Sequence, residues 1–164
     1  MGTIVKHKYP YTSDAVYNML LNRDYVEKKY PEIGFTDVKI VYFDKKDDTF
    51  VIQTRRDIVA DIPGFAKKFI QPKSTLIQTD TWVISDDPRK TGTVQLETEG
   101  LPVRMNGRMQ LQPTDDGCLN VFDYEIKVNI PLIGGRLARF LEEQGMKSGE
   151  DEYVYNLAYL KEYA

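Results

Sequence analysis

The sequence predicts an α+β domain built on one antiparallel sheet. Three observations lead to this class. A strand-like segment precedes two short helical segments, six segments of alternating apolar and polar residues follow, and a proline-free helical stretch ends the chain. No repeat, low-complexity tract or linker interrupts the 164 residues, so residues 1–164 are expected to form a single domain.

The N-terminal segment is expected to hold one strand and two short helices. Residues 3–11, TIVKHKYPY, have the composition of a strand. The polar residues 12–14 offer side-chain oxygens that can cap a first helix. A second short helix is expected over residues 22–30, ended by Pro31 and Gly34.

Six further strands are expected between residues 35 and 128. Their boundaries follow from turn sequences such as SDDPRKTG, GLP and TDDG. The expected strands are 35–44, 48–58, 74–85, 92–100, 103–113 and 118–128. In the later strands apolar residues share one face and charged or amide residues the other, so one face of the sheet should meet water. The alternation is ambiguous in 74–85, where either Asp80 and Trp82 or Thr79 and Thr81 point inward.

The sequence NIPLIGGRL predicts the junction between the last strand and the final helix. Pro131 should stop the strand, and Gly134 and Gly135 should supply the backbone freedom for a change of direction. A phosphate-binding loop is disfavoured because Arg136 and Leu137 follow the glycines in place of Lys and Ser or Thr.

The final helix is expected over residues 135–163, a length of about 40–45 Å. Both of its ends are amphipathic, but its middle, EEQGMKSGEDE, lacks an apolar stripe. Two explanations remain open. Either the helix bends and frays at Gly145 and Gly149, or its middle faces water or a cavity.

Composition and charge exclude several classes of protein. The net charge of -3 and the pI of about 5.3 argue against a nucleic-acid partner, which would favour a concentrated basic surface. The N-terminus has no apolar secretion signal, and no stretch approaches the roughly 18 apolar residues of a membrane span. We therefore expect a cytoplasmic protein, and a monomer.

Residues suited to catalysis or metal binding are few. His7 is the only histidine, which excludes a multi-histidine metal site, and its alternation with Val5 and Tyr9 is typical of an ordinary strand residue. Cys118 is the only cysteine, so it has no disulfide partner, and it is expected to be unreactive at the end of a hairpin. No catalytic residue, metal ligand or cofactor is assigned.

Four segments carry a resemblance to a known family: DIPGFAKKFIQPK, TDTWVIS, VRMNGRMQLQPTDDG and VNIPLIGGRL. Together with the element order, they resemble the START/SRPBCC superfamily, and within it a bacterial branch known as a domain of unknown function. The resemblance runs from Ile4 to about Leu160. It implies a helix-grip fold, in which the long C-terminal helix crosses the concave face of a curved seven-stranded antiparallel sheet, with a ligand cavity between the two.

The leading functional hypothesis is a protein that binds or transports a hydrophobic or amphipathic small molecule, such as a lipid, in this cavity. One alternative is an enzyme of the polyketide cyclase or hydratase type, in which Asp80, Tyr124 or Asp151 exchanges protons with the ligand. A second alternative is a protein-interaction module that resembles a chaperone partner and has a collapsed cavity. The expected cavity residues are Arg56, Asp80, Trp82, Met105, Met109, Phe122, Tyr124, Leu141, Gln144 and Tyr155.

Two expectations concern the polar and basic residues around the cavity. If Arg56 and Asp80 both face it, a buried charge would mark an anchor for a polar ligand group. The segment DIPGFAKKFIQP should form a short amphipathic helix, either packed at the domain edge or acting as a lid that transiently touches anionic membrane. The lid residues are Ile62, Phe65, Lys67, Lys68 and Phe69.

Overall fold

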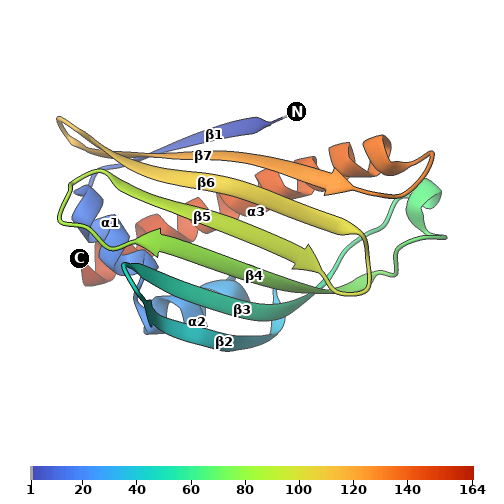
Figure 1. The fold of residues 1–164 in the computed structure, drawn as a ribbon, viewed down its shortest axis with the longest axis horizontal. Coiled ribbons are helices and arrows are strands. Elements are labelled where there is room, and N and C mark those ends of the chain that lie inside the picture. The colour runs from blue at the N-terminus through green and yellow to red at the C-terminus, as the bar shows by residue number, and fades with distance from the viewer. Residues whose placement is uncertain (1) are drawn as a thin grey trace.

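A computed structural model describes residues 2–164 and shows one seven-stranded antiparallel sheet with its helices on one side (Figure 1). The strand order is β1-β7-β6-β5-β4-β3-β2, so the first strand pairs with the last. The elements are β1 (Thr3–Tyr9), α1 (Ser13–Leu20), α2 (Arg23–Glu32), β2 (Thr36–Lys46), β3 (Thr49–Val59), the 3₁₀ turn η1 (Gly64–Ala66), β4 (Lys73–Val83), β5 (Lys90–Thr98), β6 (Val103–Thr114), β7 (Gly117–Val128) and α3 (Gly134–Tyr163). The α+β helix-grip fold is confirmed.

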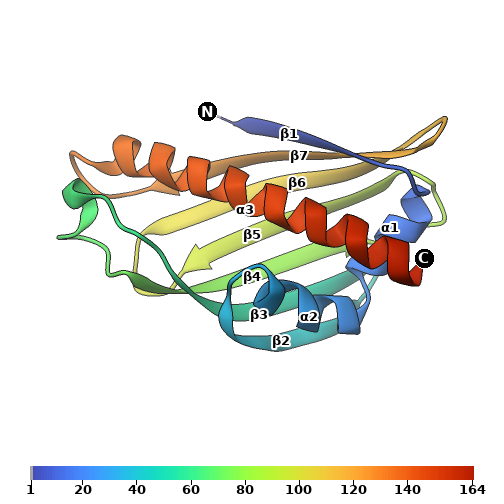
Figure 2. The ribbon, with the colours of Figure 1, turned by 180° about the vertical axis from the view of Figure 1, so that it is seen from behind.

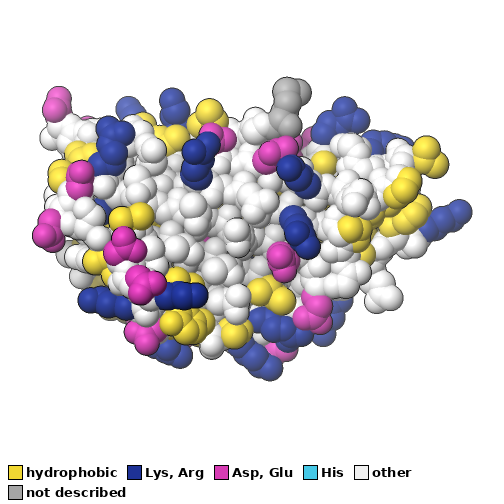
Figure 3. Space-filling model, in the orientation of Figure 1, with side chains coloured by type: hydrophobic (Ala, Val, Ile, Leu, Met, Phe, Trp, Pro, Cys, Tyr) yellow, Lys and Arg dark blue, Asp and Glu magenta, His cyan; other side chains and the backbone are white. Residues whose placement is uncertain are grey.

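The two faces of the sheet differ as the alternation predicts. Helix α3 runs diagonally across the concave face, and α1 and α2 lie on the same side (Figure 2). The opposite face is largely polar, with scattered charges of both signs (Figure 3). On that face Gln95, Glu97 and Arg104 are exposed, whereas Val94 and Leu111 point inward and are buried. The period of two therefore assigned these strands to the correct faces.

The two short helices begin at side-chain caps. Thr12 accepts a hydrogen bond from the backbone N–H of Ala15 (3.1 Å), and Asn22 caps α2 in the same way. Helix α2 does not end before Pro31, as the sequence suggested, but includes it in its last turn. The hydrogen bond that proline cannot donate is lost near the helix end, where few bonds remain to be interrupted. Gly34, with φ of 103°, follows the helix.

The segment between β3 and β4 is not the amphipathic helix that its sequence pattern predicted. Only the single 3₁₀ turn Gly64–Ala66 forms there. Pro63 is extended (φ -59°, ψ 149°), and the following Gly64 has poor helix propensity, so the helix is not propagated. The segment is held by the burial of Ile62, Ala66 and Ile70 against the first turns of α3.

The junction between β7 and α3 also differs from the expectation. The left-handed backbone falls on Leu132 (φ 71°), and neither Gly134 nor Gly135 has a positive φ. Gly134 is instead required for close approach, because a Cβ there would lie 2.7 Å from the carbonyl oxygen of Val128. The prediction that the glycines supply the turn was therefore wrong.

Helix α3 is anchored at both ends and not in its middle. Near its start, Leu137 belongs to the small core cluster with Ile62, Ala66 and Ile70. Near its end, Leu160 belongs to the main cluster, which includes residues of α1, α2 and the sheet. The helix continues through Gly145 and Gly149, and residues 143–147 are exposed. The middle of α3 lacks an apolar stripe because it is not packed against the sheet, and the helix does not break there.

Candidate functional site

The space beneath the middle of α3 is a cavity of about 480 Å³. This volume lies within the roughly 300–1,000 Å³ that is usual for small-molecule sites. The sheet forms the floor, α3 forms the roof, and α2 with the β3–β4 segment closes the sides. Because the two core clusters fill the ends of the domain, the cavity occupies the gap between them.

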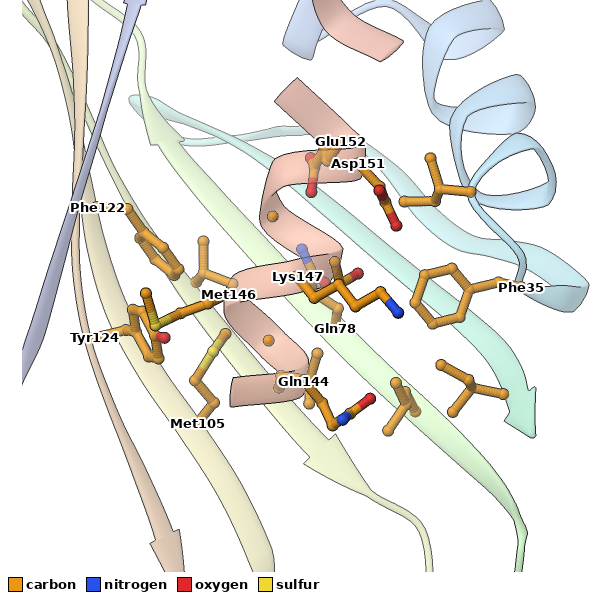
Figure 4. A pocket seen from close by; sticks show the side chains of 18 of the residues that line it. Phe35, Gln78, Met105, Phe122, Tyr124, Gln144, Met146, Lys147, Asp151 and Glu152 are labelled. Atoms are coloured by element: carbon orange, nitrogen blue, oxygen red, sulfur yellow. The ribbon is translucent and has the colours of Figure 1, made fainter. Parts of the chain in front are cut away.

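The β5–β7 side of the cavity is mostly apolar, although Asn120 and the hydroxyl of Tyr124 also lie on it. Figure 4 shows Met105, Phe122 and Tyr124 of the sheet directed toward Met146 of α3. The rings of Phe122 and Tyr124 stack with their centroids 4.9 Å apart. Met105 and Phe122 are only half-buried although they lie on the inward face, which is what an unfilled apolar wall produces.

The β3–β4 side carries a chain of polar side chains. Arg56 donates from Nη2 to Oε1 of Gln78 (2.8 Å), and Gln78 donates from Nε2 to Oδ1 of Asp80 (2.8 Å). Arg56 also makes a longer contact from Nη1 to Thr54 (3.4 Å). Arg56, Gln78 and Asp80 all line the cavity, so this wall is polar while the opposite wall is mostly apolar.

A partly buried ion pair lies beside this chain, since the side chain of Lys29 is buried and that of Glu152 is 36% exposed. Nζ of Lys29, on α2, is 2.8 Å from a carboxylate oxygen of Glu152 on α3. The ammonium also lies over the rings of Tyr25 (4.8 Å) and Tyr30 (4.5 Å). The pair joins the two helices that form the roof and the side of the cavity.

The environment shifts the pKa values of these groups in different directions. Burial raises the pKa of Asp80, and the positive charge of Lys29 and the hydrogen bond from Gln78 only partly counter it. Burial opposes the charge of Glu152 as well, but the adjacent Lys29 outweighs it and leaves the pKa of Glu152 lowered. The pKa of Lys29 is raised well above its usual value, because attraction to Glu152 and nearby tyrosines exceeds the effect of burial.

Unpaired polar atoms are concentrated at the cavity. Three buried side-chain atoms in residues 2–164 have no hydrogen-bond partner: Nε of Arg56, Oδ1 of Asn120 and the hydroxyl of Tyr124. All three residues line the cavity. Since buried polar groups are normally paired, this distribution suits a site that receives a partner of its own.

Sequence comparison places the chain in a family. The profile of the family described as "Protein of unknown function (DUF2505)" matches residues 5–160. The chain belongs to the DUF2505 family. None of the curated proteins matches the sequence at a significant level.

This DUF2505 chain shares its fold with proteins described as STAR-related or START-superfamily members, in agreement with the predicted resemblance. It is similar to TTHA0849 from Thermus thermophilus, with 16% identity, a TM-score of 0.61 and coverage of 98% of this chain and 96% of that one. It is similar to a STAR-related lipid transfer protein from Xanthomonas axonopodis, with 14% identity, a TM-score of 0.61 and coverage of 98% and 85%. A START superfamily protein from Mycobacterium smegmatis matches at 11% identity with a TM-score of 0.58 and coverage of 100% and 98%.

Nine of the ten expected cavity residues of the DUF2505 chain lie at the cavity wall. These are Arg56, Asp80, Trp82, Met105, Met109, Phe122, Tyr124, Leu141 and Gln144. Tyr155 does not, because α2 lies beside α3 and the Tyr155 ring is directed toward Tyr25 and Tyr159. The ambiguity in β4 is resolved, since Asp80 and Trp82 point inward while Thr79 bonds Gln53 on the other face. That these residues bind a ligand stays a prediction.

Several cavity residues were not foreseen from the sequence. Gln78 shares the inward parity of Asp80, so the β4 alternation could have indicated it. Lys29 and Glu152 gave no such signal, because their pairing depends on how α2 docks against α3. Tyr30 and Phe35 gave no such signal either, because they flank Arg56 only when α2 and the residues after it pack against β3.

The expected lid residues are divided between the cavity and the surface. Ile62 lines the cavity and is buried. Phe65 lies under the guanidinium of Arg136, and Cζ of Arg136 is 4.1 Å from the centroid of the Phe65 ring. Lys67, Lys68 and Phe69 are exposed.

The remaining reactive residues have structural partners. His7 lines the cavity, stacks on Tyr153 (4.3 Å) and bonds Glu150 (2.7 Å). Burial raises the pKa of Cys118 to about 11, so its reactive thiolate form is disfavoured.

Within residues 2–164, no group of His, Cys, Asp and Glu side chains is arranged to hold a metal ion. Over the same residues, no helix has the length and apolar character to span a membrane.

Proposed function

We propose that the chain binds or transports a hydrophobic or amphipathic small molecule in the cavity beneath α3. The observation that carries the proposal is the unfilled volume of about 480 Å³ between two well-packed core clusters. A domain of this size does not need such a void for stability, since empty apolar space forfeits packing energy. The similarity of the fold to that of a STAR-related lipid transfer protein supports a lipid-like ligand.

The cavity is tested by filling it. We expect Met105→Trp, which places a larger ring at the apolar wall, to reduce the amount of lipid-like compound retained by freshly purified protein in native mass spectrometry. The matched control is Asn106→Trp, one residue along β6 on the exposed outer face, which should retain as much as the wild type.

The outcomes separate the three functional hypotheses. A retained compound that Met105→Trp alone excludes supports the binding protein. A chemically altered compound would favour the enzyme alternative, in which Asp80, Tyr124 and Asp151 are available at the cavity wall. Protein that retains nothing and exchanges no added amphiphile would contradict the proposal and favour the interaction module.

We further propose a transient contact with anionic membrane at the end of the domain near the β3–β4 segment. Leu132 is fully exposed (104%) and Phe69 is 44% exposed. The β3–β4 segment, which carries Phe69 and the exposed Lys67 and Lys68, and the β7–α3 connection, which carries Leu132, lie at the same end of the molecule in both ribbon views (Figures 1 and 2). Figure 3 shows hydrophobic atoms and basic side chains gathered there. Such a mixture suits an anionic lipid surface.

Vesicle co-sedimentation tests this contact. We expect more protein to sediment with phosphatidylglycerol vesicles than with phosphatidylcholine vesicles, and the charge-reversed Lys67→Glu, Lys68→Glu variant to lose the difference. Lys45→Glu, Lys46→Glu on the distant β2–β3 hairpin is the matched control. Equal sedimentation with both lipids would contradict the contact.

A further inference from the structure

Arg56 is unlike the other buried bases of the described chain. Three basic side chains are buried among residues 2–164: Lys29, Arg56 and Lys90. Lys29 pairs with Glu152 at 2.8 Å, and Lys90 pairs with Asp14 at 3.2 Å. Arg56, only 4% exposed, takes part in no ion pair among these residues. A buried cation without an acid is unfavourable unless something else supplies the negative charge.

The neighbours of Arg56 stabilise its position but do not neutralise it. The guanidinium lies between the rings of Tyr30 (4.1 Å) and Phe35 (4.6 Å), which hold its plane and attract its charge. Its hydrogen-bond acceptors, Thr54 and Gln78, are both neutral. Asp80 and Glu152 lie near enough for the charge of Arg56 to favour their ionised forms, but neither forms an ion pair with it, and Gln78 stands between Asp80 and Arg56.

The donors Nε and Nη2 of the guanidinium indicate which chemical group of a ligand could bind Arg56. Nε and Nη2 form one edge of the planar group, which matches the two oxygens of a carboxylate. Nε has no acceptor, and Nη2 is satisfied only by the amide oxygen of Gln78. A carboxylate that displaced this amide would occupy both donors.

The rest of the cavity indicates what the carboxylate is attached to. Away from Arg56 the wall turns apolar, toward Met105, Phe122 and Tyr124 (Figure 4). At about 30 Å³ for a water-sized group, the 480 Å³ has room for roughly 16 such groups. A chain of about a dozen carbons with its head group fits this space.

Lys147 adds a second positive charge on the roof of the cavity. It lines the cavity from α3, and Figure 4 shows its ammonium directed toward Phe35, one of the two rings that flank Arg56. Unlike Arg56, Lys147 is exposed. An acid entering from this side therefore passes a solvated cation before it reaches the buried one.

We propose that the ligand is an amphiphile with a single carboxylate, and that this carboxylate binds Arg56 between Tyr30 and Phe35 while the apolar chain lies against β5–β7. This inference rests on the proposal that the cavity is a ligand site. It adds the chemical class of the head group and the residue that recognises it.

The test compares dodecanoate with dodecanol, which differ in the head group and share the chain. Binding is measured by displacement of the neutral dye Nile red from the full chain. We expect the wild type to bind dodecanoate about ten- to a hundredfold more tightly, the usual range for hydrogen bonds to a charged group. Arg56→Gln should lose that advantage while its dodecanol affinity changes by less than about threefold.

Two variants serve as controls. Arg55→Gln removes the neighbouring cation on the outer face, where Arg55 pairs with Glu99 (3.1 Å), and should leave both affinities unchanged. Gln78→Glu places a permanent carboxylate beside Nη2 of Arg56, so it should abolish the preference for dodecanoate even if Arg56→Gln proves unable to fold. Circular dichroism establishes whether each variant is folded.

Each outcome has a distinct consequence. Equal binding of dodecanoate and dodecanol by the wild type, or equal weakening of both in Arg56→Gln, overturns the carboxylate inference and leaves the cavity proposal intact. A preference for dodecanoate that survives in Gln78→Glu also overturns it. Failure of both amphiphiles to displace Nile red contradicts the cavity proposal itself, and the inference with it.

Discussion

Asn156 links three elements around the cavity, and its replacement by leucine gives a quantitative test of the structure. The hydroxyl of Tyr25, on α2, donates to Oδ1 of Asn156 (2.5 Å), and Nδ2 of Asn156 donates to the hydroxyl of Tyr9 on β1 (3.1 Å). All three side chains are buried. Leucine in place of Asn156 cannot bond either hydroxyl.

The magnitude follows from the two orphaned groups. Each buried hydroxyl that loses its partner costs about 1–3 kcal/mol, so the pair costs about 4 kcal/mol. Burial of the leucine side chain offsets about 2 kcal/mol of this. We expect Asn156→Leu to lower the free energy of unfolding by about 2 kcal/mol, measured by urea denaturation with the slope of the transition unchanged.

The decisive measurement is the triple variant Tyr9→Phe, Tyr25→Phe, Asn156→Leu. Removing the orphaned hydroxyls should restore the stability to within about 1 kcal/mol of the wild type, because the polar network is then absent and not half-satisfied. If the three substitutions are additive and the triple variant is the least stable, Asn156 does not act through these two hydroxyls.

Three further predictions concern charge and backbone strain. Because its folded-state pKa is raised, Asp80 contributes stability that is present below its ordinary pKa of 3.8 and lost as the pH rises through the folded value. Asp80→Asn should therefore melt above the wild type at pH 7 but not near pH 4, and a lower melting temperature at pH 7 would contradict this. Glu152→Gln should cost about 2 kcal/mol in urea denaturation, because it removes the counter-charge of the buried Lys29 from a pair that is only partly screened by solvent, against under about 0.5 kcal/mol for Glu27→Gln at the exposed pair with Arg23. Equal losses would refute the argument from the burial of Lys29. Leu132→Asn should add about 1 kcal/mol by relieving the φ of 71°, whereas Leu132→Ala, which keeps the strain, should add nothing. The same denaturation measurement compares the two, and equal stabilities would show that this strain is absent.

The apolar wall of the cavity was predictable because strands have a period of two. Met105 lies between Arg104 and Asn106, and Phe122 begins an alternation with Asp123 and Glu125, so their inward direction follows from local sequence. The polar wall was predictable only in part. Arg56 and Asp80 were foreseen as candidates, but the Gln78 bridge between them depends on the register of β3 against β4.

Some predictions were wrong because tertiary packing overrode the local pattern of apolar and polar residues. The segment 61–72 has helical spacing of apolar residues, yet its side chains are held by α3 and its backbone forms one 3₁₀ turn. Tyr155 satisfied the criteria for a cavity residue, but α2 takes up that face of α3. In both cases a neighbour distant in sequence decided the outcome.

The sequence by itself determined the class of fold, the direction of most strand residues and the gap in the apolar stripe of α3. Each of these follows from the spacing of apolar residues over a few neighbouring positions. Only the tertiary structure decided that the polar middle of α3 covers a cavity, and that Lys29 pairs with Glu152, which is 123 residues away in the sequence. It also decided that Arg56 is buried between two rings and forms no ion pair within residues 2–164. These features depend on the distances between docked elements, and no local pattern encodes such distances.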